Sequence, residues 1–440
     1  MLDINRIRND PEGMRRALLK RMDRVDFTDL LGRDARRREL IAEADGLKAR
    51  RNSVSAEIPR LKKAGKDVAG LLAEMKTVSD KIKGLDAERA RVQEDIQGFL
   101  EQLPNVPDED VPAGGKENNQ VIRTHGGRRE FDFQPRDHME LAGLLGLVDY
   151  ERGARLGGNG FWVYRARGAV LEWALLSYFV ERHLEAGYEF ILPPHILTYA
   201  CGYTAGQFPK FEEDVYLLAD ANRADAPRAD APRAGAPGSR SFLLPTAETA
   251  LASLHRDEIL SESELPRKYF SYTPCYRREA GSYRKNERGM IRGHQFNKVE
   301  LFQYTRPELS EEALTELLGR AEALVQALGL HYRVSLLAAR DASASMARTY
   351  DIEVWLPSIG EYKEVCSAST ARDYQARRGG IRFKRGETGR NEYVYTLNAS
   401  GLATSRLLPA LCEQHQRADG SVPVPEVLRK WTGFEIMEPE

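Results

Sequence analysis

The sequence of 440 residues predicts an α+β protein that carries an antiparallel α-helical coiled-coil arm at its N-terminus. An apolar heptad repeat over residues 71–103 predicts the arm. Beyond residue 120, alternating hydrophobic stretches, aromatic residues and short helical stretches predict a mixed domain, residues 121–440. The segment PNVPDEDVPAGGKENNQ, residues 104–120, combines Pro, Gly and acidic residues and is predicted to link the two parts.

The predicted arm spans about residues 34–101 of an N-terminal domain, residues 1–103. Two seams of apolar or long side chains, spaced in alternating steps of four and three residues, define its helices. The first seam is Leu40, Ala44, Leu47, Arg51, Val54, Ile58 and Leu61, and the second is Leu71, Met75, Val78, Ile82, Leu85, Arg89, Val92, Ile96, Phe99 and Leu103. Gly65, in the break LKKAGKD, is placed to reverse the chain. Two helices of roughly 30 residues give an arm about 45 to 50 Å long.

The first helix of the arm is basic. Residues 36–66 contain ten Lys or Arg and four acidic side chains, and such a surface suits a phosphate backbone and the shape-based recognition of RNA. We expect RNA contacts from Arg36, Arg37, Arg50 and Lys62. A coiled coil used only for dimerisation is the alternative interpretation of the same heptads.

Composition limits the remaining possibilities. The formal net charge is -1, so a nucleic acid would have to bind a local basic surface. The four cysteines form no C-x-x-C pair, which argues against a zinc knuckle or a disulfide scaffold. No apolar run approaches ~18 residues, and the N-terminus MLDINRIRNDPEG lacks a hydrophobic signal region. We therefore expect a cytoplasmic protein with no membrane partner.

Two stretches of the larger domain stand out. RADAPRADAPRAGAPGSR, residues 223–240, repeats an Ala-Asp-Ala-Pro-Arg unit with little apolar content, so we expect a disordered insertion at about 221–240. The second stretch predicts two antiparallel strands, KYFSYTPCYRRE and HQFNKVELFQY. Residues two apart share a strand face, which groups Arg277 with Glu279, and Phe296 with Lys298 and Glu300.

The loop between these strands is basic. It contributes Arg284, Lys285, Arg288 and Arg292 against the single acid Glu287. An exposed hairpin with solvated charges is the structural alternative. The grouping of arginine, carboxylate and aromatic ring instead favours an anion or a nucleotide as ligand.

The sequence resembles the bacterial-type seryl-tRNA synthetases, within the class II aminoacyl-tRNA synthetases. Motifs along the whole chain carry the resemblance in order and spacing: MLDINRIRNDPEG, RNSVSAEI and LKKAGKD of the arm, FDFQPRDHMELAGLLGLVDYERGARLGG, GQFPKFEED, LPTAETAL, YTPCYRREAGS, IRGHQFNKVELFQY, EYKEVCSAS, RDYQARR and TLNASGLATSRLLPAL. The resemblance implies a class II antiparallel sheet flanked by helices. It also implies a homodimer joined around Gly168 to Pro194, and the formation of seryl-adenylate from ATP and serine, followed by transfer of serine to tRNA(Ser).

The resemblance implies roles for nucleotide-binding residues. Arg277 would contact the α-phosphate, Glu279 the adenine amino group and Arg292 the triphosphate tail. Phe296 and Arg406 would cover the two faces of the base. Arg277 and Arg406 are the expected catalytic residues, because two anions must be brought together. Glu364 and Ser367, in EVCS, would hold Mg²⁺ through hard oxygen ligands.

The amino acid would meet a different set of residues. Glu248 and Glu300 would receive its ammonium group, and Arg277 would face its carboxylate. Thr246, in Thr246-Ala247-Glu248, would also belong to the serine site. Asn398 and Ser400, in LNASG, match the positions at the hydroxyl end of the pocket. A pocket that hydrogen-bonds a hydroxyl rejects alanine, because its polar groups would otherwise be buried without partners.

The chain also departs from the family pattern. TAETALAS carries Thr249, Ala250, Ala252 and Ser253 at unusual positions, and Cys366, Thr370 and Ala399 replace Ser, Asn and Gly. We expect these changes to alter the walls around the amino acid. They leave open a duplicated synthetase for antibiotic self-resistance or for a biosynthetic pathway. A carrier-protein ligase and a non-catalytic RNA-binding paralogue are two further alternatives.

Overall fold

The computed structural model describes residues 1–218, 240–279 and 289–440. By its internal contacts the chain forms two compact units. One contains Leu2–Pro104, and the other contains Asn105–Glu440 together with Met1. The predicted insertion at 221–240, apart from Arg240, lies outside the described residues, as do Arg284, Lys285, Glu287 and Arg288 of the basic loop.

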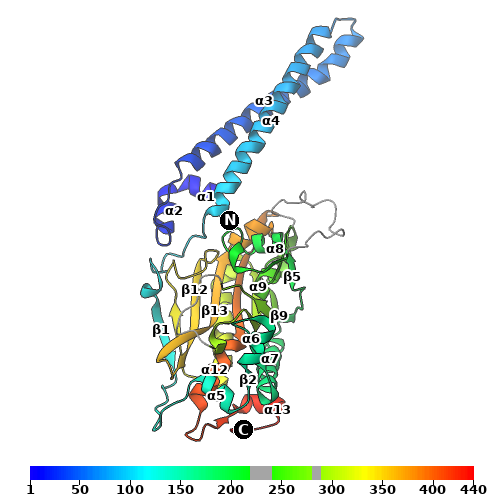
Figure 1. The fold of residues 1–440 in the computed structure, drawn as a ribbon. Coiled ribbons are helices and arrows are strands. Elements are labelled where there is room, and N and C mark those ends of the chain that lie inside the picture. The colour runs from blue at the N-terminus through cyan, green and yellow to red at the C-terminus, as the bar shows by residue number, and fades with distance from the viewer. Residues whose placement is uncertain (219–239, 280–288) are drawn as a thin grey trace. The chain divides into compact units, whose positions relative to one another are not determined.

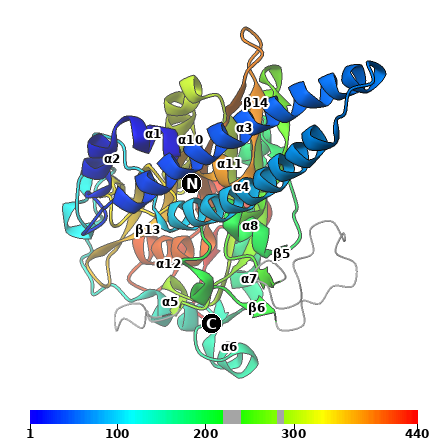
Figure 2. The ribbon, with the colours of Figure 1, turned by 90° about the horizontal axis from the view of Figure 1, so that it is seen from above.

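The N-terminal unit is a long helical hairpin preceded by two short helices. α1 (Ile4–Asn9) and α2 (Pro11–Leu18) lead into α3 (Thr28–Lys63) and α4 (Ala69–Gln102). In both views α3 and α4 run side by side (Figures 1 and 2). α3 begins before position 34, and its 36 residues extend about 54 Å. Gly65 adopts a φ of +71°, which suits glycine at the reversal.

The apolar seams form the interface between α3 and α4. Met75, Val78, Ile82, Leu85 and Ile96 of α4 are buried. Leu40 and Ala44 of α3 pack in one cluster with Leu85, and Leu47 and Val54 pack against Met75, Val78 and Ile82. The predicted coiled-coil arm is confirmed.

Asp34 anchors the base of this hairpin. Its fully buried carboxylate accepts from Arg8 (2.8 Å) and Arg37 (2.6 Å) and lies 3.3 Å from Arg38 Nε. Burial raises the pKa of the Asp34 carboxyl, but the hydrogen bond from Arg8 and the charge of Arg37 outweigh it and hold the pKa below its usual value. The arginines therefore stabilise the ionised form of Asp34.

The larger unit is built on an eight-stranded sheet in the order β1-β11-β12-β13-β16-β10-β9-β4. All neighbours are antiparallel except β4 and β9. The strands are β1 (Gln120–His125), β4 (Glu189–Phe190), β9 (Arg267–Tyr276), β10 (Gln295–Thr305), β11 (Tyr332–Leu336), β12 (Arg348–Leu356), β13 (Glu361–Arg372) and β16 (Tyr395–Ala403). The predicted pairing of the two strands around residues 268–305 is confirmed, with Phe296 opposite Cys275.

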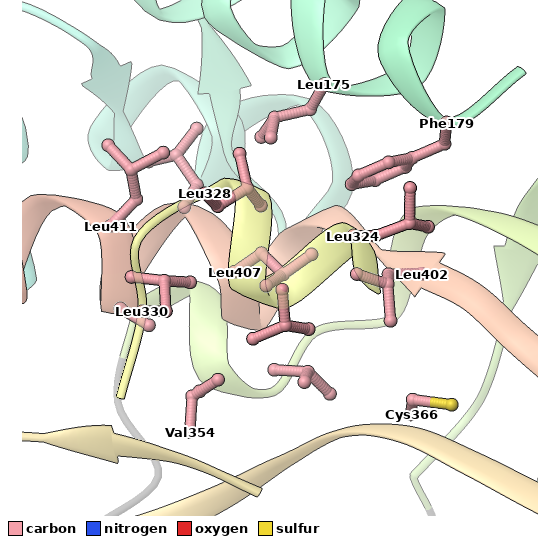
Figure 3. Close-up of a cluster of buried hydrophobic side chains, with 14 of the residues drawn as sticks. Leu175, Phe179, Leu324, Leu328, Leu330, Val354, Cys366, Leu402, Leu407 and Leu411 are labelled. Carbon is pink, nitrogen blue, oxygen red and sulfur yellow. The ribbon is translucent and has the colours of Figure 1, made fainter. Parts of the chain in front are cut away.

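One face of the sheet packs on the main hydrophobic core. Helices α7 (Ala166–Glu185), α10 (Ser310–Ala327) and α12 (Thr404–His415) contribute Leu175, Phe179, Leu324, Leu407 and Leu411 (Figure 3). Along β10, Val299 and Leu301 enter this core, whereas Phe302 and Tyr304 join a second cluster. The alternation places the two clusters on opposite faces of the sheet. We call them the core face and the site face.

Short elements complete the larger unit. The helices are α5 (His138–Leu144), α6 (Tyr150–Gly157), α8 (Tyr199–Thr204), α9 (Ala247–Leu251), α11 (Tyr374–Gly379) and α13 (Arg429–Thr432). The strands are β2 (Val148–Asp149), β3 (Val163–Tyr164), β5 (Ile196–Thr198), β6 (Leu217–Leu218), β7 (Ser241–Leu243), β8 (Ile259–Ser261), β14 (Arg382–Lys384), β15 (Asn391–Tyr393), β17 (Val422–Pro423) and β18 (Ile436–Met437). Within the described ranges, no helix combines the length and hydrophobicity that crossing a bilayer requires.

Candidate active site

The site face collects the predicted ligand-binding residues on adjacent strands. Phe296, Lys298 and Glu300 alternate along β10 with residues of the core. The register of β10 against β16 places Ser400 opposite Glu300 and Asn398 opposite Phe302. Residues about one hundred positions apart in the chain thus become neighbours.

Arg277 and Phe296 form the centre of the predicted nucleotide platform. The Arg277 guanidinium lies 5.1 Å from the centroid of the Phe296 ring, and its Nε donates to the carbonyl of Pro245 at 3.1 Å. These two contacts fix the plane of the guanidinium over the aromatic ring. The next residue along the chain, Thr246, belongs to the predicted amino-acid pocket.

Glu279 does not lie on a strand, although the sequence predicted that it would. β9 ends at Tyr276, and Glu279 has a φ of +50°, so Arg277 and Glu279 do not share a strand face. The extended backbone that the pattern required stops before Arg277. Glu279 instead forms an ion pair with Arg292, which joins the predicted adenine-binding and triphosphate-binding residues.

Arg406 lies in the first turn of α12 and bridges two segments. Its Nε donates to the carbonyl of Ile291 at 3.0 Å, next to Arg292. Its Nη1 donates to the backbone carbonyl of Glu364 at 2.8 Å and lies 3.3 Å from the Glu364 carboxylate. Arg406 therefore lies between the segment of Arg292, predicted to bind the triphosphate, and Glu364, predicted to bind Mg²⁺.

Glu172 of α7 holds the supporting elements together beneath the platform. Its Oε1 accepts from Asn297 Nδ2 (2.8 Å) and from the Thr404 hydroxyl (2.6 Å). Asn297 adjoins Phe296, and Thr404 begins the helix that carries Arg406. Burial raises the pKa of Glu172 to about 7, against the effect of these hydrogen bonds.

The predicted Mg²⁺ ligands lie side by side. The Ser367 hydroxyl is 3.2 Å from Glu364 Oε1 and donates to Asp351 Oδ1 at 2.6 Å. With its hydrogen directed to Asp351, the hydroxyl can offer lone pairs to a cation. This donor set of a hydroxyl and a carboxylate fits Mg²⁺. Among the described residues, no cluster of three or more His, Cys, Asp or Glu side chains is arranged to hold a metal, so phosphates and waters would have to complete the shell.

The predicted amino-acid pocket is polar and closely bonded. Thr246 Oγ1 lies 3.4 Å from Glu300 Oε2, and Asn398 Nδ2 lies 3.4 Å from Glu300 Oε1. Gln375 of α11 donates to Glu248 at 2.8 Å. Removal from bulk water, followed by the charge of Glu300, raises the pKa of Glu248 to about 7. Glu248 therefore ionises less readily than an ordinary glutamate.

Three polar residues of this site received no role from the sequence. Lys298 shares the parity of Phe296 and Glu300, and this pattern could have identified it. Gln375 and Asp351 come from α11 and β12, which reach the site only through the fold. Gln375 lies in the motif RDYQARR, which gave it no role, and no local pattern marks Asp351.

The substitutions expected to alter the pocket walls lie largely elsewhere. Ala399 pairs with Leu301 and Ala368, and all three enter the main core. Cys366 lies in the same core, where Figure 3 shows it in one cluster with Leu402 and Val354. For these two positions the expectation was wrong, because strand alternation turns their side chains to the core face while Asn398 and Ser400 face the site.

The other substitutions also bond away from the amino-acid pocket. The Thr370 hydroxyl lies 3.3 Å from that of Ser310 at the start of α10. Thr249 is fully buried and donates to Gln207 at 3.0 Å. Ser253 lies one turn further and donates to the carbonyl of Thr249 at 3.2 Å.

The predicted RNA-binding residues of the arm differ in their surroundings. Arg36 pairs with Glu88 and Glu39, and Arg50 pairs with Glu74. Arg37 is committed to Asp34 and to Gln93, whose Oε1 lies 2.8 Å away. Lys62 is exposed and forms no ion pair within the described part of the chain. The same holds for its neighbours near the reversal, which are Arg60, Lys63 and Lys66.

Two surface features lie apart from the site face. A cleft of about 910 Å³ between α7 and α10 is lined by residues that include Arg182, Glu185, Glu316 and Arg320. Helix α7 and the chain after it also expose large apolar side chains. These are Val170, Trp173, Leu184, Phe190 and Leu192, of which Trp173 is 60% exposed.

An antiparallel sheet with a stacking ring and carboxylates at one face, and with arginines supplied by the adjoining loop and helix, fits a class II aminoacyl-tRNA synthetase domain. In agreement, residues 236–415 match the family model of the tRNA synthetase class II core domain (G, H, P, S and T). Residues 1–107 match the model of the seryl-tRNA synthetase N-terminal domain.

Whole-chain relatives identify the family. The chain is 59% identical to serine–tRNA ligase 2 of Clostridium acetobutylicum over 98% of this chain and 99% of the relative. It is 44% identical to the serine–tRNA ligase of Caldicellulosiruptor bescii over the full length of both. The crystal structure of Pyrococcus horikoshii seryl-tRNA synthetase complexed with ATP matches with a TM-score of 0.90 and 34% identity over the whole of both chains. The chain belongs to the seryl-tRNA synthetases.

Proposed function

We propose that this protein activates serine with ATP to form seryl-adenylate and transfers the seryl group to the 3′ end of tRNA(Ser). The observation that carries the proposal is three sets of contacts joined by short stretches of chain: Glu279 with Arg292, Arg277 with Phe296 and Pro245, and Thr246 with Glu300. ATP bound to the Pyrococcus horikoshii relative supports a nucleotide on this platform. We assign residues 1–103 to tRNA binding, 104–120 to the connection and 121–440 to catalysis.

The chemistry follows from the placement of charge. The serine carboxylate must approach the α-phosphate of ATP, and their mutual repulsion is reduced by a cation fixed between them. Arg277 would be that cation, and its contacts with Phe296 and Pro245, beside Thr246, support this assignment. Arg292 and Arg406 would receive the remaining phosphate charge, and Phe296 would orient the base. Pyrophosphate leaves as the carboxylate oxygen bonds to the α-phosphorus.

Glu364 and Ser367 would hold Mg²⁺. When bound there, the ion would supply charge neutralisation for the phosphates. Asp351 accepts the Ser367 hydrogen bond and fixes the direction of that hydroxyl. Arg406 holds the Glu364 backbone carbonyl, and so links this ligand pair to α12.

Two further assignments depend on surfaces. The arm would bind the tRNA through phosphate contacts, for which the cations near Gly65 are the most accessible. Exposed apolar side chains on α7 and up to Leu192 coincide with the segment Gly168 to Pro194, and support a homodimer joined there. Sedimentation equilibrium of the wild type and of Trp173→Glu would test the dimer.

Pyrophosphate exchange tests the activation step. The purified protein is incubated with ATP, labelled pyrophosphate and either serine, threonine, alanine or glycine. We expect exchange with serine and much less with alanine, because alanine leaves the polar hydroxyl end of the pocket unpaired. Charging of tRNA(Ser), with a carrier protein as the alternative acceptor, tests the second step. Absence of serine-dependent exchange would refute the proposal.

A specialised second synthetase is the other candidate. The name of the Clostridium acetobutylicum relative, serine–tRNA ligase 2, favours it. Its test is inhibition of exchange by a serine analogue, compared between this enzyme and the 44% identical relative. Equal inhibition of both enzymes would argue against a role in self-resistance.

A further inference from the structure

Lys298 already contacts two residues that are assigned to the serine site. Its Nζ donates to Thr246 Oγ1 at 2.7 Å and forms an ion pair with Glu300 Oε2. The side chain is only 8% exposed. Glu300 is one of the two carboxylates assigned to the ammonium group of serine, and Thr246 is assigned to the same substrate. A second ammonium, supplied by the protein, therefore shares these acceptors.

The charges that face this pocket balance. Two carboxylates, Glu248 and Glu300, meet two cations, Lys298 and Arg277. The other facing groups from neighbouring elements are the Cys275 thiol of β9 and the amides of Gln375 and Asn398. A zwitterionic amino acid adds one charge of each sign. It can enter without changing the net charge of a poorly hydrated site.

We propose that Lys298 is a positioning residue for amino-acid binding: its ammonium, held by Thr246 and Glu300, balances the charge of the Glu300 and Glu248 carboxylates, which receive the α-ammonium of the substrate. This inference rests on the proposed function of the site. It assigns Lys298 no contact with ATP and no part in bond making. It predicts that Lys298 affects the recognition of one substrate group only.

The physical reason is the cost of two carboxylates in one enclosed pocket. Without Lys298, Glu248 and Glu300 would face only the Arg277 guanidinium. Glu248 would then hold its proton up to a higher pH, and a protonated carboxyl is a poor acceptor for an ammonium ion. The Glu300 carboxylate keeps the pKa of the Lys298 ammonium above its usual value, although burial lowers it. Lys298 therefore stays charged throughout the neutral range.

The sign of the pH dependence follows. The pKa of Glu248 is raised to about 7, by burial first and by Glu300 second, and the charge of Lys298 opposes the rise. Glu248 is ionised above that pH, so the affinity for the substrate ammonium should increase as the pH rises from 6 to 8. Removing Lys298 should move this increase to higher pH.

The test uses a sulfamoyl analogue of seryl-adenylate and the same analogue without its α-amino group. Both are titrated calorimetrically, from pH 6 to 9, into the wild type, Lys298→Met and the control Lys268→Met. Lys268 lies on β9, the strand that pairs with the β10 strand of Lys298. It forms an ion pair with Glu316, 2.7 Å away, outside the site. We expect Lys298→Met to weaken the amino-bearing analogue by about tenfold or more, to leave the desamino analogue within about twofold, and to raise the pH midpoint.

The outcomes separate this inference from the proposed function. If the wild type binds neither analogue, the proposed function fails. If Lys298→Met weakens both analogues equally, or keeps the wild-type pH midpoint, Lys298 has only a structural role and the inference is overturned. Lys298→Arg, which retains the charge in another shape, gives a second test. It should keep the wild-type midpoint even where its affinity falls, and a midpoint shifted as in a neutral variant would contradict the inference.

Discussion

Removing the cations near the tip of the arm should weaken tRNA binding without disturbing the protein. The variant replaces Arg60, Lys62, Lys63 and Lys66 with alanine. These side chains are exposed and form no ion pair in the described part of the chain. In the matched variant, Arg36 and Arg50 are replaced by alanine, and both of these arginines already face carboxylates of α3 or α4. The comparison of the two variants distinguishes the contribution of the four cations near the tip to tRNA binding from that of arginines already paired with carboxylates.

The magnitude follows from counterion release. Each neutralised duplex phosphate contributes about 0.9 to the slope of log affinity against log salt concentration. Four available cations therefore set an upper limit of about 3.6 for the loss of slope in the tip variant. The paired arginines should contribute much less, because their charges are partly cancelled before RNA arrives. Surface substitutions of this kind should change the free energy of unfolding by no more than about 0.5 kcal/mol.

The assay measures the KM for tRNA(Ser) between 50 and 200 mM salt, approximately the range in which counterion effects are large. Pyrophosphate exchange on the same samples reports the catalytic domain and should not change. A tip variant with the wild-type KM and slope, beside a paired-arginine variant that loses both, would refute the assignment. Arg37→Ala is a poor probe of RNA binding, because it leaves the buried Asp34 carboxylate short of a partner and should cost about 1–3 kcal/mol.

Three other substitutions address the catalytic domain. Arg277→Lys should reduce the kcat/KM of pyrophosphate exchange by about tenfold or more, because an ammonium cannot both donate to Pro245 and stack on Phe296; unchanged exchange kinetics would exclude that role. Ala399→Gly should lower the free energy of unfolding in urea by about 1–2 kcal/mol through loss of a buried methyl and added chain entropy, with the serine KM unchanged. A severalfold change in that KM would instead place residue 399 in the pocket. Ser367→Ala should raise the Mg²⁺ concentration for half-maximal exchange about tenfold, and an unaltered Mg²⁺ titration would remove Ser367 from the ligand set.

The sequence predicted elements whose signals are periodic. Heptad spacing predicted both arm helices, and alternation along residues 295–305 correctly grouped Phe296, Lys298 and Glu300. Alternation also carried the information that Ala399 and Asn398 face opposite sides, although proximity in the chain suggested that both line the pocket. Resemblance identified ligand positions, but strand parity decides which neighbours can touch a ligand.

Other features had no periodic signal. The charge count of the first arm helix could not show that Arg36, Arg37 and Arg50 meet acidic partners, because most of those acids lie on α4 or across a turn. Glu279 was expected on a strand, yet the chain leaves the extended conformation before it. Gln375 and Asp351 depend on long-range packing. In each case the missing information was a tertiary contact.

The two-sided sheet has a consequence for how such an enzyme can diverge. Along β10 and β16, successive side chains face opposite sides of the sheet. One packs against the leucines of the main core, and the next lies on the site face, where small molecules would bind. A lineage adapting to a new temperature can therefore exchange residues at every second position and keep its turnover and substrate preference.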